Sequence, residues 1–195
     1  MNTDLVAPPE FKVIILGDSA VGKSSIVLRI SQETFDYQMD TTIGASHVQK
    51  RMETPKGPII LNIWDTAGQE RYRSLIPIYL RAAQAALICY DVTNRQSFLS
   101  LEHWIEDVQK ICPSDIHIYI VGNKCDLEDV VPIVEAEDFA ASRKYPFFRT
   151  SAKLGKNIIE LFNALSCDLL GGDELHQTVI NITEEKKETS NKKCC

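Results

Sequence analysis

One stretch decides the fold of this chain: Gly17-Asp18-Ser19-Ala20-Val21-Gly22-Lys23-Ser24. It matches the pattern G-x-x-x-x-G-K-[ST], in which glycines let the backbone wrap tightly and several N–H groups point at bound phosphates. The apolar run Phe11–Leu16 precedes it, and a helical pattern over Ser25–Ser31 follows it. Because the motif requires this placement between a strand and a helix, we predict a phosphate-binding loop here.

Each part of the phosphate-binding loop has a predicted role in binding the nucleotide. Its backbone N–H groups and the positive end of the following helix would surround the phosphates. The Lys23 ammonium group would reach the β- and γ-phosphates, and the Ser24 hydroxyl would bind Mg²⁺. The predicted phosphate-binding residues are Ser19, Ala20, Val21, Gly22, Lys23, Ser24 and Ser25.

Short apolar runs alternate with amphipathic stretches over about residues 11–170. The runs that we interpret as buried strands are Phe11–Leu16, Ile59–Trp64, Ala85–Asp91, Ile116–Gly122 and Phe147–Thr150. A more polar run, Ser46–Thr54, is predicted to form an edge strand, joined to the next run by a turn at Pro55-Lys56-Gly57-Pro58. Apolar residues at helical spacing predict helices around Phe98–Val108 and Ile158–Leu169.

Buried strands separated by helices are typical of a parallel sheet that is covered on both faces. We therefore predict an α/β fold of the P-loop NTPase type, with a six-stranded, mostly parallel sheet and helices on both faces. In such a sheet, ligands bind beyond the carboxyl ends of the strands. Polar motifs follow the apolar runs at those ends.

A second polar motif, Asp65-Thr66-Ala67-Gly68-Gln69-Glu70, follows one of these runs. The Asp65 carboxylate would lie beside the phosphate-binding loop and hold Mg²⁺, directly or through water. Gly68 would let a backbone N–H approach the γ-phosphate, and the Gln69 amide would orient an attacking water. We therefore assign catalytic roles to Gln69, Gly68 and Lys23. A polar turn that ends a strand is the alternative interpretation of the motif.

The connection before the edge strand contains Thr41-Thr42-Ile43-Gly44. A threonine hydroxyl there would close on Mg²⁺ only when a γ-phosphate is present. The predicted metal ligands are Ser24, Thr42 and Asp65.

Two further strand ends carry Asn123-Lys124-Cys125-Asp126 and Ser151-Ala152-Lys153. Guanine offers N1–H and an exocyclic amine as hydrogen-bond donors. The Asp126 carboxylate can accept both, which adenine cannot satisfy, and an unpaired buried carboxylate is costly. Each motif alone could be an exposed loop, but all four motifs in this order predict a guanine nucleotide site.

The other residues of these two motifs would surround the base. Asn123 would address N7 and tie the loops together, and the Ala152 N–H would meet O6. The aliphatic stems of Lys124 and Lys153 would cover the faces of the base. The predicted base-binding residues are Asn123, Lys124, Asp126, Ser151, Ala152 and Lys153.

With these motifs, the chain resembles the Ras superfamily of small GTPases and, within it, the Rab family. The resemblance covers nearly all of residues 9–170 and includes Trp64–Leu75, which is similar to the second switch of Rabs. The stretches Gly17–Arg29, Thr42–Ala45 and Ala83–Ala86 are most similar to the early-endosomal branch.

The resemblance implies a G domain over residues 9–171 that acts as a switch in vesicle trafficking. It would bind GTP or GDP with Mg²⁺, hydrolyse GTP slowly, and recruit effectors in its GTP state. Phe35 would lean on the guanine edge, and Thr42 and Gly68 would grip the γ-phosphate. The implied partners of this monomer are an exchange factor, a GTPase-activating protein, a GDP-dissociation inhibitor and effectors.

The two ends of the chain are expected to lie outside the folded domain. Residues 1–8 are expected to be flexible, and residues 172–195 to form a disordered tether, because such polar segments cannot bury enough apolar surface. The pair Cys194-Cys195 resembles the doubly geranylgeranylated end of Rabs, and two lipids give stable anchoring. The implied location is the cytoplasmic face of endomembranes such as endosomes, with cycling through the cytosol. Two unmodified thiols are the alternative.

Composition sets outer limits. The 195 residues, 44% of them apolar, suffice for one domain with a sizeable core. The net charge of −6 and the lack of a basic stripe argue against a nucleic acid partner. The six cysteines have no disulfide-framework or zinc-site spacing. Those interpreted as small core residues are Cys89, Cys112, Cys125 and Cys167.

One position departs from the family pattern. Rabs usually carry a phenylalanine where this chain has His47, as part of an aromatic triad that effectors read; Trp64 and Tyr79 are the other two members. The histidine leaves the nucleotide chemistry intact but puts the usual effector set in doubt. A pH switch and an ordinary exposed histidine are both open.

Two other classes of protein compete with this interpretation. A P-loop metabolic enzyme, such as a nucleotide kinase, would need a lid and an acceptor site, whereas the helices here look short and Asn123–Asp126 specifies guanine. A scaffold that holds GTP permanently would not need Gln69, Thr42 and Asp65.

Overall fold

A computed structural model of the chain describes residues 7–36, 42, 44–66, 75–112 and 116–171. These residues contain one six-stranded sheet with the order β2-β3-β1-β4-β5-β6. The strands are β1 (Glu10–Leu16), β2 (Ala45–Thr54), β3 (Gly57–Thr66), β4 (Ala85–Asp91), β5 (His117–Asn123) and β6 (Phe147–Arg149). The pair β2 and β3 is antiparallel, and the other neighbouring pairs are parallel. The predicted fold class is confirmed.

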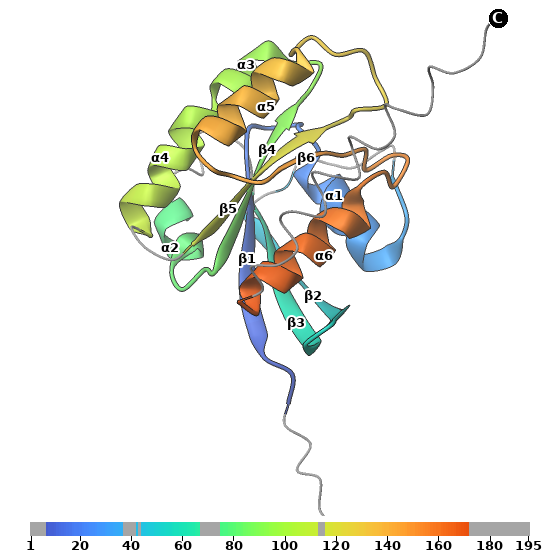
Figure 1. Ribbon diagram of the computed structural model, residues 1–195, viewed down its shortest axis with the longest axis vertical. Helices are drawn as coiled ribbons and strands as arrows, with labels where there is room; N and C mark the ends of the chain where they lie inside the picture. Colours follow the sequence, from blue (N-terminus) through green and yellow to red (C-terminus); the bar gives the residue numbers. More distant parts are fainter. Residues whose placement is uncertain (1–6, 37–41, 43, 67–74, 113–115, 172–195) are drawn as a thin grey trace, which may run out of the picture.

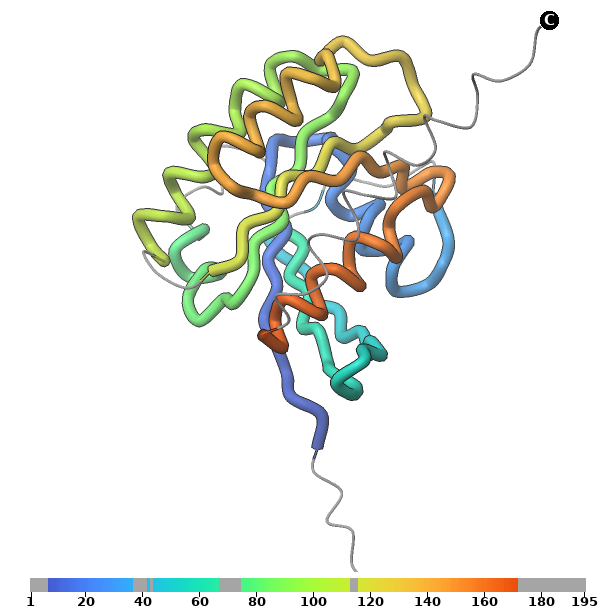
Figure 2. Tube along the Cα trace, viewed as in Figure 1, coloured from blue at the N-terminus to red at the C-terminus, as the bar shows by residue number. Residues whose placement is uncertain are grey.

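Helices cover both faces of this sheet (Figure 1). On one face, α1 (Lys23–Gln32) lies beside α6 (Ile158–Leu169), although the two come from opposite ends of the chain (Figure 2). The other face is covered by α2 (Ile76–Leu80), α3 (Arg95–Leu99), α4 (Leu101–Ile111) and α5 (Ile133–Ser142). None of the described helices is both long and apolar enough to cross a membrane.

Each face of the sheet has its own apolar core, because side chains alternate along a strand. On β1, Val13 and Ile15 pack with α1 and α6, whereas Ile14 and Leu16 pack with the helices of the other face. All four side chains are fully buried. Burial on both faces explains why the central strands appear in the sequence as continuous apolar runs.

The pattern Phe98–Val108, predicted as helical, spans two helices rather than one. Ser100 lies between α3 and α4. The Asn94 side chain caps α3 by accepting hydrogen bonds from the backbone N–H groups of Gln96 and Ser97. Because of this cap, α3 begins at Arg95, three residues before the apolar pattern begins at Phe98.

Helix α5 was not predicted from the sequence. Its buried positions are Ala136 and Ala140, whose small side chains stand at helical spacing. Val134 on the same helix is apolar but exposed. The contrast between the two faces of α5 is therefore weak, and a periodicity argument does not detect it.

The hairpin turn between β2 and β3 is shorter than predicted. Pro55 and Lys56 form the turn, and Gly57 already pairs with Thr54 as the first residue of β3. The Thr54 hydroxyl closes the turn by donating to the Gly57 carbonyl at 2.7 Å and accepting from the Lys56 N–H at 3.2 Å. Pro58 is tolerated because it stands at the start of its strand.

The four cysteines within the described residues are free thiols. Cys89 is buried, as predicted for a core residue, whereas Cys112, Cys125 and Cys167 are only half-buried. The interpretation of these three as core residues was therefore too strong.

Candidate functional site

The phosphate-binding loop joins β1 to α1 at the carboxyl end of the sheet. Gly17 has φ +136°, and a Cβ there would lie 2.2 Å from the Cys89 carbonyl oxygen. Gly22 has φ +96°, and a Cβ there would lie 2.3 Å from Nδ2 of Asn123. Both positions therefore need glycine for two reasons: a Cβ would clash with a residue of β4 or β5, and the backbone has a positive φ.

The N-terminus of α1 opens directly onto this loop. Its N-cap residue is Gly22, and no side chain caps the helix. The first N–H groups of a helix have no partners inside the helix, and they carry partial positive charge. The start of α1 can therefore accept an anion.

Lys23 is buried at the start of α1 and bridges the two ends of the loop. Its Nζ donates to the carbonyl oxygens of Gly17 at 2.9 Å and Asp18 at 2.7 Å. Burial lowers the pKa of Lys23, while nearby groups that include the Asp65 carboxylate oppose this shift. Bound phosphates would also favour the charged ammonium.

The three predicted metal ligands lie together. The hydroxyl oxygens of Ser24 and Thr42 are 2.7 Å apart, and the Thr42 hydroxyl lies 3.5 Å from Oδ2 of Asp65. The Asp65 side chain is buried, and burial raises its pKa against the opposing effects of Ser24 and Lys23. Its Oδ1 is buried without a hydrogen-bond partner among the described residues.

This orphaned oxygen tests whether Mg²⁺ fits the site. A buried carboxylate oxygen without a partner is costly, and a divalent cation would compensate it. Mg²⁺ prefers oxygen ligands, and it commonly binds one or two carboxylates together with phosphate oxygens. One carboxylate and two hydroxyls beside a phosphate-binding loop match that preference.

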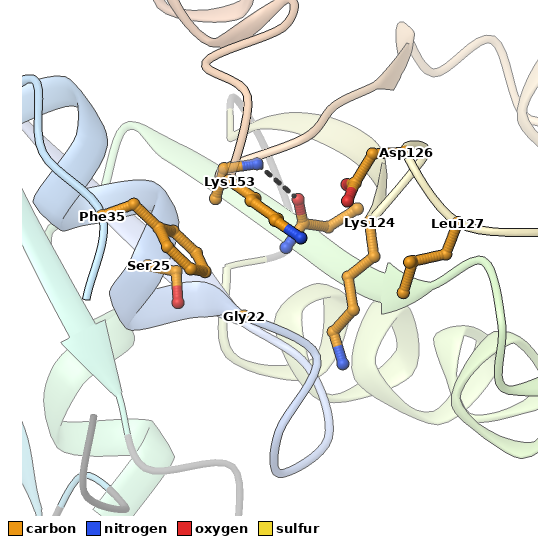
Figure 3. A pocket seen from close by; sticks show the side chains of 9 residues that line it. Gly22, Ser25, Phe35, Lys124, Asp126, Leu127 and Lys153 are labelled. Atoms are coloured by element: carbon orange, nitrogen blue, oxygen red, sulfur yellow. Dashed lines mark hydrogen bonds between the residues drawn. The ribbon is translucent and has the colours of Figure 1, made fainter. Parts of the chain in front are cut away.

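A pocket of about 210 Å³ continues from the phosphate-binding loop towards β5 and β6. Figure 3 shows Phe35, Lys153 and Asp126 around it, contributed by three separate segments of the chain. The lining residues are Gly22, Ser25, Phe35, Asn123, Lys124, Asp126, Leu127, Ala152 and Lys153. All predicted base-binding residues except Ser151 line this pocket.

Asn123, the last residue of β5, joins three loops. Its Nδ2 donates to the Val21 carbonyl at 2.9 Å, while its Oδ1 accepts from the Thr150 hydroxyl and the Ala152 N–H, each at 3.2 Å. The Ala152 N–H, predicted to meet O6 of guanine, therefore contacts Asn123 in this structure. The arrangement ties the phosphate-binding loop to the base loops.

Ser151 acts behind the pocket rather than in its wall. Its hydroxyl donates to Oδ1 of Asp126 at 2.5 Å and accepts from the Leu154 N–H at 3.1 Å. One oxygen of the Asp126 carboxylate is thereby held in place. The orientation of this carboxylate is set before any base binds.

Two contributors to the site were not found from the sequence. The first is Asp91, whose carboxylate pairs with Lys124 at 2.6 Å and is held by the backbone N–H and hydroxyl of Thr93. The signal in the sequence was a single acidic residue at the end of an apolar run. The Lys124 ammonium group therefore has a fixed partner beside the pocket.

The second is Arg29 on α1. Its guanidinium donates to the carbonyl oxygens of Ala152 at 2.8 Å and Lys153 at 2.7 Å, and also to that of Glu33 at 2.7 Å. These bonds link the helix behind the phosphates to the loop beside the base. No motif in the sequence indicated this link, because Arg29 and Lys153 are 124 positions apart.

We expect Arg29→Met to accelerate GDP release by about tenfold or more, because two hydrogen bonds to the loop beside the base are lost and a hydrogen bond from a charged donor contributes about 1.5–3 kcal/mol net. Stopped-flow displacement of fluorescent GDP measures the rate. Arg143→Met is the matched control, since Arg143 pairs with Glu102 on α4, away from the pocket. Equal rates for Arg29→Met and the wild type would contradict the linking role.

Known proteins with similar sequences identify the family. Residues 12–170 match the model of the Ras family. The chain is 41% identical to human Ras-related protein Rab-31 over 196 residues, which cover 98% of this chain and 100% of that protein. It is 45% identical to human Ras-related protein Rab-22A over 159 residues, 80% of this chain and 82% of that protein. The chain belongs to the Rab family of small GTPases.

A third relative extends this likeness beyond mammals. The Rab GTPase described here is 43% identical to GTP-binding protein ypt5 of Schizosaccharomyces pombe over 170 residues, 85% of this chain and 81% of that protein. The predicted resemblance to the Rab family is confirmed. As a Rab, the chain is a GTPase of a family that acts in vesicle trafficking.

The three rings of the aromatic triad expected of a Rab lie side by side, with His47 in the place of the usual phenylalanine. The ring centroids of His47 and Trp64 are 5.1 Å apart, and those of Trp64 and Tyr79 are 6.1 Å apart. The exposed His47 also places Nε2 3.1 Å from Oδ1 of Asn62. His47 therefore keeps a ring contact with Trp64 and adds a polar contact with Asn62.

Some predicted residues lie outside the described part of this Rab. Gly68 and Gln69 fall within residues 67–74, and Cys194 and Cys195 fall within residues 172–195. Their assigned roles stay predictions.

Proposed function

We propose that this Rab GTPase is a membrane-anchored switch that binds GTP or GDP with Mg²⁺, hydrolyses GTP slowly and recruits effectors in its GTP state. One observation supports it above others. The uncapped start of α1, the orphaned Asp65 oxygen and the pocket beside Asp126 adjoin one another at one edge of the sheet. Phosphates, a base and a metal cation are all parts of one nucleotide–metal complex.

Ser24, Thr42 and Asp65 are the residues that would hold Mg²⁺. Bound there, Mg²⁺ would neutralise charge on the β- and γ-phosphates. Lys23, already buried beside Asp65, would supply a second positive charge. The base would bind among Phe35, Asp126 and the other pocket residues.

Hydrolysis would proceed by in-line attack of a water that Gln69 positions, with the Gly68 N–H near the γ-phosphate. The phosphate-binding loop contains no arginine. An arginine supplied by a GTPase-activating protein would then be needed for fast turnover. In the related Ras case, intrinsic hydrolysis runs at about 10⁻⁴ s⁻¹ and rises about 10⁵-fold with that arginine.

The switch would involve two segments, about residues 35–45 and 68–79. Thr42 and Gly68 would contact the γ-phosphate and order these segments, and hydrolysis would release them. The Ser24–Thr42 contact of 2.7 Å supports a link between the first segment and the metal site. An exchange factor would restore the GTP state.

The membrane anchor would be geranylgeranyl groups on Cys194 and Cys195, carried on a flexible tether over residues 172–195. One lipid binds a membrane only marginally, whereas two bind stably. A GDP-dissociation inhibitor would return the protein to the cytosol. The relatives Rab-31 and Rab-22A, together with the early-endosomal likeness of the phosphate-binding loop, support endosomes as the location.

We expect Cys194→Ser with Cys195→Ser to move a tagged full-length protein from endosomal membranes to the cytosol, because two lipids are lost. Imaging against organelle markers measures the location, and mass spectrometry measures the modification. Cys167→Ser, a half-buried thiol on α6, is the control and should leave the location unchanged. Unmodified cysteines in the native protein would refute the anchor.

A further inference from the structure

Trp104 contacts the phosphate-binding loop from α4, a helix that does not line the nucleotide pocket. It lies on α4, and only 7% of its surface is exposed. Its indole Nε1–H donates a hydrogen bond of 2.8 Å to Oδ1 of Asp18, the second residue of the loop. The carbonyl oxygen of the same Asp18 accepts from Lys23. The backbone carbonyl of Asp18 therefore holds Lys23 in the phosphate site, while the Asp18 side chain bonds to α4.

A carboxylate in a phosphate-binding loop opposes the ligand. Asp18 is near enough to Lys23 for its negative charge to act on the Lys23 ammonium group. The same charge would repel phosphates bound beside Lys23, because salt screens charges fully only beyond the Debye length of about 10 Å at 0.1 M. The loop therefore contains an electrostatic cost that its backbone N–H groups and Lys23 must overcome.

The hydrogen bond from Trp104 limits this cost. An indole N–H donates but cannot accept, and it carries no net charge. It therefore fixes the direction of the carboxylate without neutralising it. Trp104 belongs to the apolar core on the α4 side of the sheet, so packing holds the donor in place.

We propose that Trp104 is a positioning residue for the phosphate site, which holds the Asp18 carboxylate against α4 and away from the bound phosphates. This inference rests on the proposed nucleotide binding. It gives α4 a function in the affinity for GTP, although no residue of α4 lines the nucleotide pocket.

The test compares Trp104→Phe, Asp18→Asn and the double variant in the full-length protein. Phe keeps most of the apolar volume and removes the donor, whereas Asn removes the charge that the donor holds. Release of fluorescent GDP and of a non-hydrolysable GTP analogue is measured for each protein at low and high salt, with the melting temperature. Glu106→Gln, which removes a charge from the outer side of α4, is the control and should leave both rates unchanged.

We expect Trp104→Phe to release the GTP analogue about tenfold faster, which corresponds to about 1.4 kcal/mol. GDP should be released only a few times faster, because it carries less negative charge. High salt should reduce both effects by screening. In the Asp18→Asn background, Trp104→Phe should change either rate by less than about twofold, although it still lowers the melting temperature. A purely structural role of Trp104 would produce none of this dependence on charge.

Two results would overturn the proposal. One is an equal acceleration of both nucleotides by Trp104→Phe in both backgrounds, which would assign Trp104 to packing alone. The other is no acceleration at all. If Trp104→Phe does not fold, benzothienylalanine at position 104 keeps the shape of the indole and removes only the donor. The release rates of GDP and of the GTP analogue from this variant then test the proposal by the same criteria. Failure of the wild-type chain to bind guanine nucleotides would instead refute the proposed function, and this inference with it.

Discussion

Replacing Gln69 with leucine should lower the hydrolysis rate measured with a GTPase-activating protein by about 10³-fold or more. The stimulated reaction in the related Ras case exceeds the intrinsic one by about 10⁵-fold, and it depends on a glutamine that orients the attacking water. Leucine has a similar size but can neither donate nor accept a hydrogen bond. Single-turnover release of phosphate from bound GTP measures the rate.

Binding of GTP should survive this substitution, since Gln69 is assigned to the water and not to the nucleotide. Gln109→Leu is the matched control, because Gln109 bonds to Tyr145 on the face of the sheet that carries α4 and α5. An unchanged stimulated rate for Gln69→Leu would remove Gln69 from the proposed mechanism and leave the nucleotide site as it stands.

Asp126→Asn should exchange guanine specificity for xanthine specificity. In the proposed site the Asp126 carboxylate would accept two donors of guanine, whereas an asparagine amide presents one donor and one acceptor. Xanthine has a carbonyl where guanine has the amine, so the amide complements it. Sites that hydrogen-bond a ligand reject a mismatched analogue by about 10⁴-fold, and we expect GTP to lose about 10³-fold in affinity while XTP gains a similar factor.

Competition of GTP, XTP and ATP against fluorescent GDP measures these affinities. Asp129→Asn is the matched control on the same loop, because Asp129 pairs with Arg149 and does not line the pocket. Ser151 can still donate to the amide oxygen of the variant, so the loop keeps its geometry. A variant that loses GTP without gaining XTP would show that Asp126 supports the loop and does not read the base.

The sheet was predictable from the sequence because its causes are local. A strand buried on both faces is typically a near-continuous apolar run, and β4, which is buried throughout, is apolar from Ala85 to Cys89. The phosphate-binding loop was predictable for the same reason, since Gly17 and Gly22 are needed where the backbone takes positive φ. Helix α5 was not predictable, because its buried face consists of alanines.

The positioning residues of the site could not be predicted, because their partners are distant in the sequence. Trp104 and Asp18 are 86 positions apart, and Lys124 and Asp91 are 33 apart. Neither pair forms a motif. Each pair depends on how strands and helices are aligned: Asp91 lies opposite Asn123 in the register of β4 and β5, which brings Lys124 beside it.

By itself, the sequence determined the positions of the strands along the chain, and it carried the predictions of a phosphate-binding loop and of the residue types that would select guanine. These depend on backbone conformation and on hydrogen-bonding groups within a few residues of one another. Only the tertiary structure decided which side chains orient that chemistry. The register pairs Asp65 with Ile15, one residue before the end of β1, so that the Asp65 carboxylate lies beside Ser24 and Thr42. Side-chain pairing across a sheet is a property of packing, and a linear pattern does not contain it.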